Sequence, residues 1–518
     1  MNVRSMMKNN FDRAPRRLAL LCLPLALAAC GLTRPPAWAS APIPAQWNAP
    51  LPASPGNLPT DPTALPHAGS LPALTDWWRQ LDDPVLVTLI EAAQAASPNV
   101  ASASARIAEA RGTRVQSGAA LLPTLDGTLS AQRSNSPLGG TGGGGGGGTG
   151  GPSSSLPAVT TLQAGLQSSW EIDLFGGRRA TRDAADARLQ SANARWHDAR
   201  VSVAAETANQ YFAERACQRQ LTVAESDARS RSETARLTDL SAKAGFTAPA
   251  DAALARASAA DASARLTQQR AQCAVLRKGL VAMSGLDARE LDQRLADVPA
   301  DRALPPVHAV PSVPAQMLAQ RPDVFSAEAA VAAASADVGA AEADRYPRLT
   351  LQGSVAALQL RSGGAQQSLQ TWTIGPLALT LPIFDGGVRA ANAESAKARY
   401  DEAVSLYRAN VRTAVREVEE ALVNLQATDA RTGDADTAVQ NYQTSFAATQ
   451  ARYESGLASL FELEDSRRTL FAAQTARVAL QRERAEAWVA LYRSTGGGWT
   501  RPDASLAANT SSPSLTTP

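Results

Sequence analysis

A strand-like segment that runs directly into a very long helix constrains this chain more than any other feature. From Leu162 to Leu174 the side chains alternate between apolar and polar, which is typical of a strand with one wet face. The period changes at Phe175-Gly176-Gly177, and no proline follows before Pro249. A helix over residues 177–245 would be on the order of 100 Å long. Ordinary globular cores do not accommodate such a helix, so the pattern predicts a membrane strand on a long helical stalk.

Composition excludes some function classes. The chain has 518 residues, and its 50 basic and 48 acidic side chains nearly balance, so the total charge gives no indication of a nucleic-acid partner. Aromatic residues make up only 5%, and alanine is abundant in the helical segments, which favours close packing of helices. The histidines at 67, 197 and 308 are far apart, and neither a metal-ligand spacing nor a nucleophile–base pair is present in the sequence. We therefore expect no metal, no other cofactor and no catalytic site.

The N-terminus carries an export signal. Arg13, Arg16 and Arg17 precede the apolar run 18–29, which is too short to span a bilayer as a helix. The run ends in Leu-Ala-Ala-Cys-Gly, which resembles the lipobox of bacterial lipoproteins, where the cysteine is acylated and becomes the first mature residue. An ordinary cleaved signal with an incidental cysteine is the alternative. Residue 31 is Gly31 and not Asp, so the usual inner-membrane retention signal is missing. The segment predicts a covalent lipid on Cys30 and the outer membrane as destination.

Two cysteines remain besides Cys22 of the signal peptide and the lipidation candidate Cys30. Cys217 and Cys273 lie on predicted helices, each 28 residues from the helix breaker Gly245. In an antiparallel hairpin they would come to the same height, and an oxidising periplasm permits a disulfide between them. Two buried free thiols are the alternative, because free cysteine is commonly buried.

The chain repeats itself. Ser-Pro-Asn-Val at 97–100 recurs as Arg-Pro-Asp-Val at 321–324, and a second proline follows 25 residues after the first in both places. The Phe-Gly-Gly motif recurs as Phe-Asp-Gly-Gly at 384–387. The breaker Gly245 recurs as Gly456, and a further glycine follows each of them after 40 residues. Two similar halves are expected, each with two strands and a long helical hairpin.

These patterns together predict the organisation of the whole chain. The expected segments are a signal peptide (1–29), a Pro-rich lipid tether (30–75), a first repeat (76–298), a linker (299–314), a second repeat (315–499) and a disordered tail (500–518). Strands are expected at about 124–132, 161–174, 348–359 and 372–384, and helical hairpins at 176–285 and 386–495. Pro376 and Pro382 predict a bulge or a strand end in the last strand. The Gly-rich segment 139–151 is expected to be a flexible loop, since no Gly-Lys-Ser/Thr follows it as in a phosphate loop.

Membrane strands of this kind require an oligomer. A strand that faces lipid cannot leave unpaired backbone edges, so such strands must close into a barrel. One chain offers four strands, whereas bacterial barrels start at about eight, so subunits must combine. The helix after residue 386 carries a heptad stripe, with Val404, Val411, Val418 and Leu425 at one position. That spacing predicts coiled-coil packing, and we expect the apolar stripes of the long helices to find partners on neighbouring chains.

The order of these features resembles the TolC-type outer-membrane efflux factors, and within them the lipidated OprM/NodT-like branch. The resemblance covers about residues 77–499, with landmarks SSWEIDLFGGRR at 168–179, GPLALTLPIFDGG at 375–387 and ALYRSTGGGW at 490–499. It implies a mixed α and transmembrane β fold: a homotrimer with a 12-stranded outer-membrane β-barrel on a 12-helix periplasmic α-barrel. It also implies two partners, a periplasmic adaptor protein and an inner-membrane transporter of the RND type.

In this family the tunnel closes at its periplasmic tip, where the last helix pair turns. The corresponding segment here is RYESGLASLFELEDSRR at 452–468. Matching it by position puts Glu462 and Asp465 where the family carries lumen-facing acidic rings, and Tyr453 on a tyrosine of the closed-state network. The two acidic residues are three apart and share a helix face, and symmetry copies of a carboxylate would form a cation-selective ring. The alternative is that these charges only solvate the tip.

Two further tip positions follow from the same match. The position that carries a gating arginine in TolC-type proteins is Ala458 here, so this constraint is either missing or replaced, with Arg452 and Arg467 as the candidate substitutes. On the first hairpin, Asp251 is a weaker candidate for a second gate at the same level.

The functional expectation is a passive outer-membrane exit duct for drugs or other small toxic compounds, and not an enzyme. The same fold as the duct of a type I protein secretion system is the nearest alternative. A purely structural periplasmic coiled coil or adhesin is disfavoured by the amphipathic strands, and a periplasmic lipoprotein enzyme by the lack of any site.

Overall fold

The computed structural model describes residues 34–49, 77–79, 81–134, 158–297, 318–362, 364–499 and 501. The predicted lipidation site at Cys30, the linker 299–314 and the Gly-rich segment 139–151 lie outside these residues, as does the tail from 502 onward.

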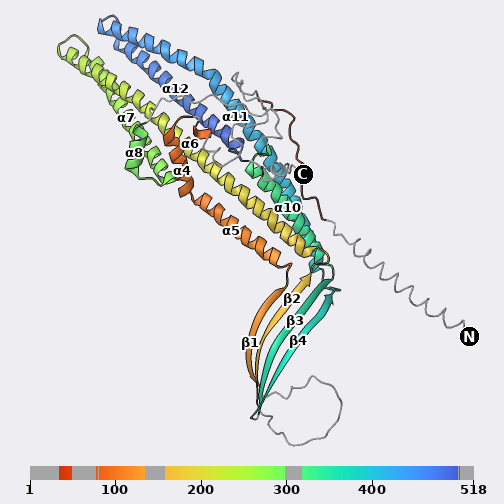
Figure 1. Cartoon of the computed structure of the whole chain (residues 1–518). Coiled ribbons are helices and arrows are strands. Elements are labelled where there is room, and N and C mark those ends of the chain that lie inside the picture. Colours follow the sequence, from red (N-terminus) through yellow and green to blue (C-terminus); the bar gives the residue numbers. More distant parts are fainter. Residues whose placement is uncertain are drawn as a thin grey trace, which may run out of the picture. The chain divides into compact units, whose positions relative to one another are not determined.

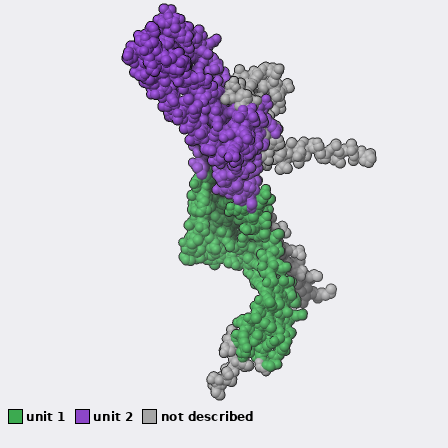
Figure 2. Space-filling view, turned by 90° about the vertical axis from the view of Figure 1, so that its left-hand side faces the viewer, with its two compact units in different colours: residues 1–39, 109–189, 329–404 green, residues 40–108, 190–328, 405–518 purple. Residues whose placement is uncertain are grey.

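Two compact units divide the chain, and each is assembled from segments that are far apart in the sequence (Figure 2). Unit 1 comprises residues 1–39, 109–189 and 329–404, and unit 2 comprises residues 40–108, 190–328 and 405–518. Both sequence repeats contribute to both units, so the duplication does not coincide with the division into compact units.

Unit 1 contains a four-stranded antiparallel sheet with the strand order β1-β2-β3-β4 (Figure 1). The strands are β1 (Thr124–Ser134), β2 (Val159–Ile172), β3 (Arg348–Ser362) and β4 (Ala365–Thr380). β1 and β4 form the edges, and within the described residues neither pairs with a further strand on its outer side. The sheet therefore ends in two rows of backbone groups that are available to another chain.

The register gives the sheet one apolar face. Leu166 of β2 lies opposite Val355 of β3, and Trp170 lies opposite Leu351. Directly opposed residues share a face, and the outer strands continue the same pattern. The further pairs on this face are Leu129 with Ala164, Leu349 with Leu379, Leu351 with Leu377, and Val355 with Trp372. The opposite face carries mainly Gln, Ser and Thr, as in the pairs Gln167–Ser354 and Ser354–Thr373.

The apolar face is exposed in the single chain. Its large side chains with more than half of their surface accessible are Leu125, Leu129, Leu166, Val355, Trp372, Ile374, Leu377 and Leu379. Water disfavours so large a contiguous apolar surface, and a patch of this kind marks contact with a membrane or another protein. With strands of 11 to 16 residues, the sheet is long enough to cross a bilayer.

The last strand differs most from the prediction. β4 begins at Ala365, seven residues before the expected start at 372, and it ends at Thr380. The turn before it contains Gly364, whose φ of +89° lies in the left-handed region that favours glycine. The early part of β4 was missed because it is polar and shows little alternation. A register shift in β3 between Leu351 and Gly353 lies opposite Gly375-Pro376, which confirms the bulge predicted at Pro376.

Two long helical hairpins follow the strands along the chain (Figure 1). Helices α6 (Gly177–Lys243) and α7 (Pro249–Ser284) form the first hairpin, and α11 (Val388–Glu454) and α12 (Leu460–Ser494) form the second. The remaining helices that Figure 1 labels are α4 (Pro84–Ala96), α5 (Pro98–Ala119), α8 (Ala288–Ala296) and α10 (Pro322–Ala343). Helix α10 is long and apolar enough to suit a membrane span, but more than half of its apolar stretch is buried inside the protein.

Aromatic side chains form the centre of the core of unit 2. Trp77 and Trp78 pack against Trp488 and Tyr492 of α12, with ring centroids 4.6 to 5.5 Å apart. Such contacts contribute beyond the area they bury. Because all four side chains are buried, they fix α12 against the start of the folded chain.

The heptad stripe of α11 packs within the chain. Val418, Leu422 and Leu425 belong to the same core as the tryptophans, and Val411 packs with Leu318 and Val324. The expectation that this stripe needs a neighbouring chain was therefore wrong for residues 411–425. Sequence periodicity indicates that a helix face is buried, but not which partner buries it.

The N-terminal segment 34–49 is extended, and it is packed against helices in both units. In unit 2, the carboxylate of Glu419 accepts hydrogen bonds from the backbone N–H groups of Asn48 and Ala49 at 2.7 and 2.6 Å. In unit 1, Ser335 and Tyr400 donate to the carbonyl oxygens of Pro35 and Pro36. The described part of the Pro-rich segment is therefore held along its length by side chains that accept from or donate to its backbone.

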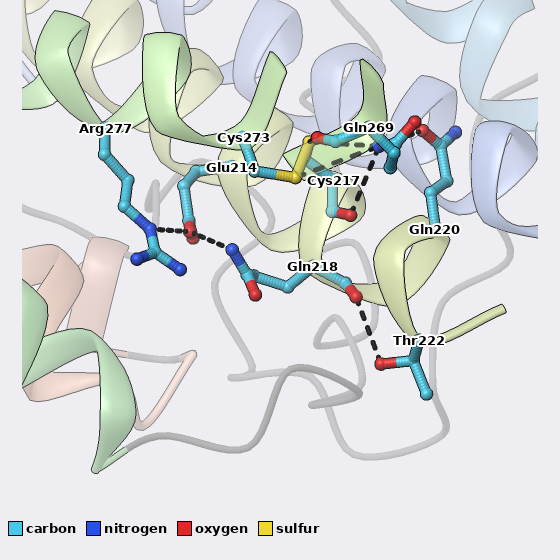
Figure 3. Close-up of a disulfide and its surroundings, with 8 residues drawn as sticks. All are labelled: Glu214, Cys217, Gln218, Gln220, Thr222, Gln269, Cys273 and Arg277. Atoms are coloured by element: carbon cyan, nitrogen blue, oxygen red, sulfur yellow. Dashed lines mark hydrogen bonds and ion pairs between the residues drawn. A yellow bond between two sulfur atoms is a disulfide. The ribbon is translucent and has the colours of Figure 1, made fainter. Parts of the chain in front are cut away.

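A disulfide joins the two helices of the first hairpin (Figure 3). Cys217 of α6 and Cys273 of α7 have Cα atoms 5.6 Å apart, and 56 residues separate them in the sequence. Gln269 donates to the sulfur of Cys217 at 3.1 Å, and Arg277 of α7 pairs with the buried Glu214 of α6 at 3.0 Å. Covalent and ionic links together fix the axial register of α6 and α7.

We expect the double variant Cys217→Ser/Cys273→Ser to lose about 4 kcal/mol of stability in the chain-entropy account of disulfides. Thermal unfolding of the purified protein would measure the loss, with Ser284→Ala in α7 as a control for a serine change without a crosslink. Thiol titration of the denatured protein gives an independent check. Equal thiol counts with and without reductant would show that the bond does not form.

Candidate gate at the hairpin tips

Both hairpins turn through the same backbone motif. Gly245 and Gly456 have φ values of +81° and +74°, and each follows a helix as its left-handed C-terminal residue. At the first tip Phe246 N–H donates to the Ser241 carbonyl at 2.9 Å, and at the second tip Leu457 N–H donates to the Arg452 carbonyl at 2.7 Å. This is the Schellman pattern, and it supports the prediction that these glycines break the helices.

Glu462 forms a reciprocal cap at the start of α12. The hydroxyl of Ser459 accepts from the Glu462 N–H at 3.2 Å, and the Glu462 carboxylate accepts from the Ser459 N–H at 2.7 Å. This is the capping box that Ser-x-x-Glu predicts. The Ser459 N–H, and after it the hydroxyl, hold the pKa of Glu462 below its usual value. Glu462 therefore stays charged at a lower pH than an ordinary exposed glutamate.

Asp465 lies on the same exposed side of α12. Its carboxylate pairs with Arg468 at 2.5 Å, and both side chains are substantially exposed. Leu463 and Arg467, by contrast, are buried on the opposite side of the helix. The structure thus brings the two predicted acidic residues onto one accessible face, although Arg468 balances part of the charge.

Tyr453 connects the two hairpins. Its hydroxyl lies 3.1 Å from the hydroxyl of Thr238 on α6, and its ring packs against a small apolar cluster of Ala235, Ala255, Leu460 and Leu463. Asp251 lies in the first turn of α7, where the helix dipole favours a negative charge. Among the described residues, no hydrogen bond or ion pair joins Asp251 to Glu462 or Asp465.

The two arginines considered as substitutes at Ala458 have other contacts. Arg452 donates to the Leu457 carbonyl at 3.1 Å and so supports the turn itself. Arg467 is buried, pairs with Glu464 at 2.6 Å and donates to Thr234 of α6 at 3.1 Å. Within one chain, therefore, both guanidinium groups bind internal partners.

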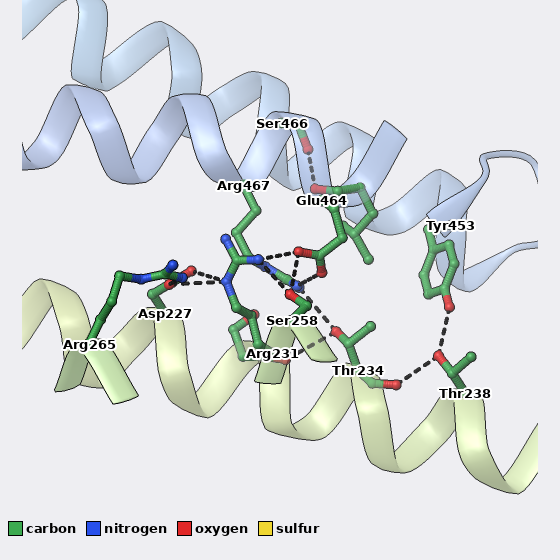
Figure 4. Close-up of polar contacts among 12 residues, drawn as sticks. Asp227, Arg231, Thr234, Thr238, Ser258, Arg265, Tyr453, Glu464, Ser466 and Arg467 are labelled. Carbon is green, nitrogen blue, oxygen red and sulfur yellow. Dashed lines mark hydrogen bonds and ion pairs between the residues drawn. The ribbon is translucent and has the colours of Figure 1, made fainter. Parts of the chain in front are cut away.

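Sequence reasoning missed a buried charged cluster near the hairpin tips (Figure 4). Arg231 of α6 pairs with Asp227 at 2.9 Å on its own helix and with Glu464 of α12. Ser258 of α7 bonds to both Arg231 and Glu464, at 2.6 and 2.8 Å. The i, i+4 pair Asp227–Arg231 and the i, i+3 pair Glu464–Arg467 were visible in the sequence, but each is equally typical of a solvated helix surface.

Comparison with known proteins places the chain in a family. The family model described as outer membrane efflux protein matches residues 89–286 and 313–497, which include all four strands and both hairpins. The chain belongs to the outer membrane efflux protein family. The resemblance to TolC-type proteins of the OprM/NodT-like branch is thereby confirmed.

Relatives of this efflux protein match over nearly their whole lengths. The pyoverdine export outer membrane protein OpmQ of Pseudomonas putida is 31% identical over 94% of this chain and 98% of its own. Nodulation protein T of Rhizobium leguminosarum bv. viciae is 26% identical and covers 94% of both chains. The solvent efflux pump outer membrane protein SrpC of Pseudomonas putida is 28% identical over 92% of this chain and 97% of its own.

Solved structures show the same fold. The outer-membrane channel OprN superposes with a TM-score of 0.73 at 28% identity, covering 90% of this chain and 99% of that one. The outer membrane protein VceC of Vibrio cholerae gives a TM-score of 0.68 at 26% identity, covering 82% and 99%. The efflux protein is therefore an outer-membrane channel of the TolC type, with its helices extending into the periplasm.

Replacing Ser459 with alanine tests the local electrostatics of the efflux protein's tip. The variant loses the hydroxyl that helps to lower the Glu462 pKa, so that pKa should rise toward its ordinary value. A carboxylate with a depressed folded-state pKa stabilises above its unfolded pKa, and this contribution is lost as the pH falls through the folded value. The gap in unfolding temperature between wild type and Ser459→Ala should thus be largest at neutral pH and shrink in acid.

The exposed tip serine Ser455, which donates to the Ala451 carbonyl, gives the control variant Ser455→Ala. Its unfolding temperature should differ from wild type by an amount that does not depend on pH. Parallel pH curves for wild type and Ser459→Ala would contradict the proposed coupling between Ser459 and Glu462.

Proposed function

We propose that the protein works as a homotrimeric, passive exit duct of a tripartite efflux system. The observation that carries this proposal is the exposed, one-sided apolar sheet with two open edges, joined along the chain to two long helical hairpins. If β1 of one copy pairs with β4 of the next, the open edges disappear. Their backbone groups cannot stay unpaired in lipid. Three copies of the four-stranded sheet would supply twelve strands; the copy number rests on the resemblance to TolC-type proteins.

Small organic compounds are the proposed cargo. The relatives are named for export of pyoverdine and efflux of solvents, toluene and antibiotics. These names favour small cargo over the protein cargo of a type I secretion duct. Since the channel is proposed to be passive, the energy comes from an inner-membrane transporter, for which we propose the RND type.

The hairpin tips are the proposed docking site of the periplasmic adaptor. Phe246 at the first tip, and Leu457 and Phe461 at the second, each expose more than two thirds of their surface. Large apolar side chains at the end of a helical bundle are costly in water and suit a hydrophobic partner surface. The adaptor would cover them in the assembled pump.

The lipid on Cys30 is the proposed second membrane attachment. Segment 34–49 begins four residues after Cys30 and is held along helices, so an acyl chain at Cys30 would be tied to the protein by an ordered strap. Wild-type protein should incorporate radioactive palmitate in growing cells, and Cys30→Ala should not. Because the strands provide their own membrane contact, the variant should still fractionate with the outer membrane if it is exported. Unlabelled wild type would overturn lipidation at this position.

Glu462 and Asp465 are the proposed acidic ring at the closed tip. Three copies of each carboxylate would favour cations over anions. In planar bilayers we expect small, cation-selective openings from wild type, and larger, less selective openings from Glu462→Ala/Asp465→Ala. Glu233→Ala is the control, because Glu233 is exposed on α6 and pairs with Arg236, three residues away on the same helix. Identical traces for all three proteins would show that the constriction lies elsewhere. If folded trimers do not conduct at all, the proposed channel function is overturned.

A further inference from the structure

A pocket lies in unit 1 where the sheet joins the helices. It is formed by the end of β2, the first turns of α6, the end of α10 and the start of β3, so both sequence repeats contribute to it. Its volume is about 270 Å³, slightly below the range of about 300–1,000 Å³ that is typical of small-molecule sites. We call it the junction pocket, defined by its five charged lining residues, Glu171, Asp173, Arg178, Asp344 and Arg348.

The shape of the junction pocket is held by contacts that do not involve these charges. Gly177 begins α6 so close to α10 that a Cβ on it would lie 2.8 Å from the Cβ of Ala343. Only glycine permits this approach of the two helix ends. Phe175 stacks on Tyr346, with ring centroids 5.0 Å apart, and this contact ties together the two connections between strand and helix. Changing a charge should therefore leave the pocket itself in place.

One charged residue of the pocket serves the fold. The carboxylate of Asp173 accepts from the backbone N–H groups of Arg178 and Arg179 at 3.2 and 2.9 Å, and from Nε of Arg179 at 3.2 Å. It thereby satisfies backbone donors in the first turn of α6, which have no partner within the helix. Asp173 is for this reason the member least available to a ligand.

The other four charged residues form two ion pairs that use only part of their hydrogen-bonding capacity. Arg178 donates to Oε2 of Glu171 at 2.6 Å, and Arg348 donates to Oδ1 of Asp344 at 2.7 Å. In the part of the chain that the structure describes, the second carboxylate oxygen of Glu171 and that of Asp344 accept no hydrogen bond. The four side chains are between 26 and 56% exposed, so a ligand can reach them.

The two ion pairs lie close together. The hydrogen bond to Glu171 raises the pKa of Arg178 above its ordinary value despite partial burial, and the charges of Asp344 and Asp173 act in the same direction. Arg178 is thus influenced by carboxylates from both connections between strand and helix. One small molecule in the pocket can meet both pairs.

This arrangement of charge selects a dipolar ligand. Because each free carboxylate oxygen lies beside a guanidinium group, a lone cation or a lone anion is attracted by one partner and repelled by the other. A molecule with both charges can donate from its ammonium group to the carboxylates and accept from the guanidinium groups, which bind carboxylates well. The remaining wall is apolar and consists mainly of Ile172, Leu174, Phe175 and Pro347.

Two of the charged side chains lie on the polar face of the sheet. Glu171 pairs with Thr350 across β2 and β3, and directly opposed residues share a face. Arg348 is two residues before Thr350 on β3, so it lies on that face too. The polar face of a membrane barrel is its interior. In the proposed trimeric barrel, the junction pocket therefore opens toward the lumen.

We propose that the junction pocket is a lumenal site for amino-acid-like zwitterions, small molecules that carry an ammonium group, a carboxylate and an apolar side group. The inference rests on the proposed function, because it takes the polar face of the sheet to line a duct. Glu171 and Asp344 accept from the ammonium group, Arg178 and Arg348 donate to the carboxylate, and the apolar wall contacts the side group. Binding must be weak, since a conducted molecule has to leave.

Three related probes test the charge requirement. They are leucine, isoamylamine, which lacks the carboxylate, and 4-methylpentanoate, which lacks the ammonium group. Saturation-transfer NMR titrations on detergent-solubilised wild-type trimers would measure their affinities. We expect leucine to bind, and each of the other two to bind at least about tenfold more weakly, because a charged hydrogen-bonding partner is lost. Glu171→Gln/Asp344→Asn and Arg348→Gln should each weaken leucine binding by a similar factor.

Two further variants complete the test. Glu394→Gln is the matched control, because Glu394 is exposed on α11 in the same unit, pairs with Lys397 and does not line the pocket. It should bind leucine as wild type does. Ala340→Met fills the pocket from α10 without changing a charge and should abolish leucine binding. This variant keeps the test valid if a charge variant fails to assemble.

A zwitterionic phospholipid headgroup carries the same two charges, and nanodiscs separate the two sources. Leucine should bind equally well to protein in nanodiscs of phosphatidylethanolamine and of phosphatidylglycerol. Loss of leucine binding only in phosphatidylethanolamine would overturn the lumenal ligand and assign the pocket to a lipid headgroup.

The remaining outcomes separate the site from the channel. Equal affinities for leucine and both analogues, or unchanged leucine binding in the charge variants and in Ala340→Met, would overturn the site. If wild type conducts in planar bilayers but does not bind leucine, the site is overturned and the duct stands. If folded trimers bind leucine with the expected charge dependence but never conduct, the proposed duct is overturned, and with it the lumenal role of the pocket.

Discussion

The need to pair every backbone group in lipid governs the rest of this structure. Within the described residues the sheet has four strands and two open edges, and its apolar side chains lie on one exposed face. A bilayer offers no hydrogen bonds, so those edges are tolerable only when another copy supplies the missing strands. The sheet is thus a fragment of a barrel, and the long helices of the same chain must accommodate the same symmetry. Oligomerisation is a condition of folding in the membrane. Without it, the exposed apolar face would favour aggregation.

Stability is distributed unevenly along the helices. In unit 2 the buried tryptophans, Tyr211 bonded to Asp83, and Val418, Leu422 and Leu425 of α11 form one core. Val411 packs in a second cluster with Leu318 and Val324. The disulfide and the Glu214–Arg277 pair then fix α6 to α7. The N-terminal strap adds backbone contacts to Glu419. These contacts make the middle of the hairpins rigid, and elements with few apolar contacts are the ones that open most readily.

Much of this fold could be predicted from the sequence, because strict patterns encode it. Alternation over 162–174 and the absence of proline before Pro249 indicated a strand and a helix of unusual length. The capping box at Ser459 follows the Ser-x-x-Glu pattern but was not predicted. The predictions failed where the sequence pattern does not determine which residues come into contact. The polar start of β4 and the short amphipathic helix α8 carried weak local signals. The stripe of α11 indicated burial without identifying its partner. The buried charged cluster around Arg231 and Glu464 could not be predicted, because charges spaced three or four residues apart are equally typical of an exposed helix surface. These charges are buried because the two hairpins pack against each other there.

The positions of the aromatic core and of the buried charged cluster explain why the buried charges are tolerated. Arg231 lies 20 residues beyond Tyr211 along α6, a distance of about 30 Å at the rise of an α-helix, so its burial is not required to complete the aromatic core. A buried ion pair seldom adds net stability compared with apolar side chains of the same size. The contacts between the hairpins near their tips also include the small apolar cluster of Ala235, Ala255, Leu460 and Leu463. The chain therefore places tryptophans in the middle of the hairpins, where they complete the large core, and buried arginines with carboxylates near the tips, where the apolar contact is smaller.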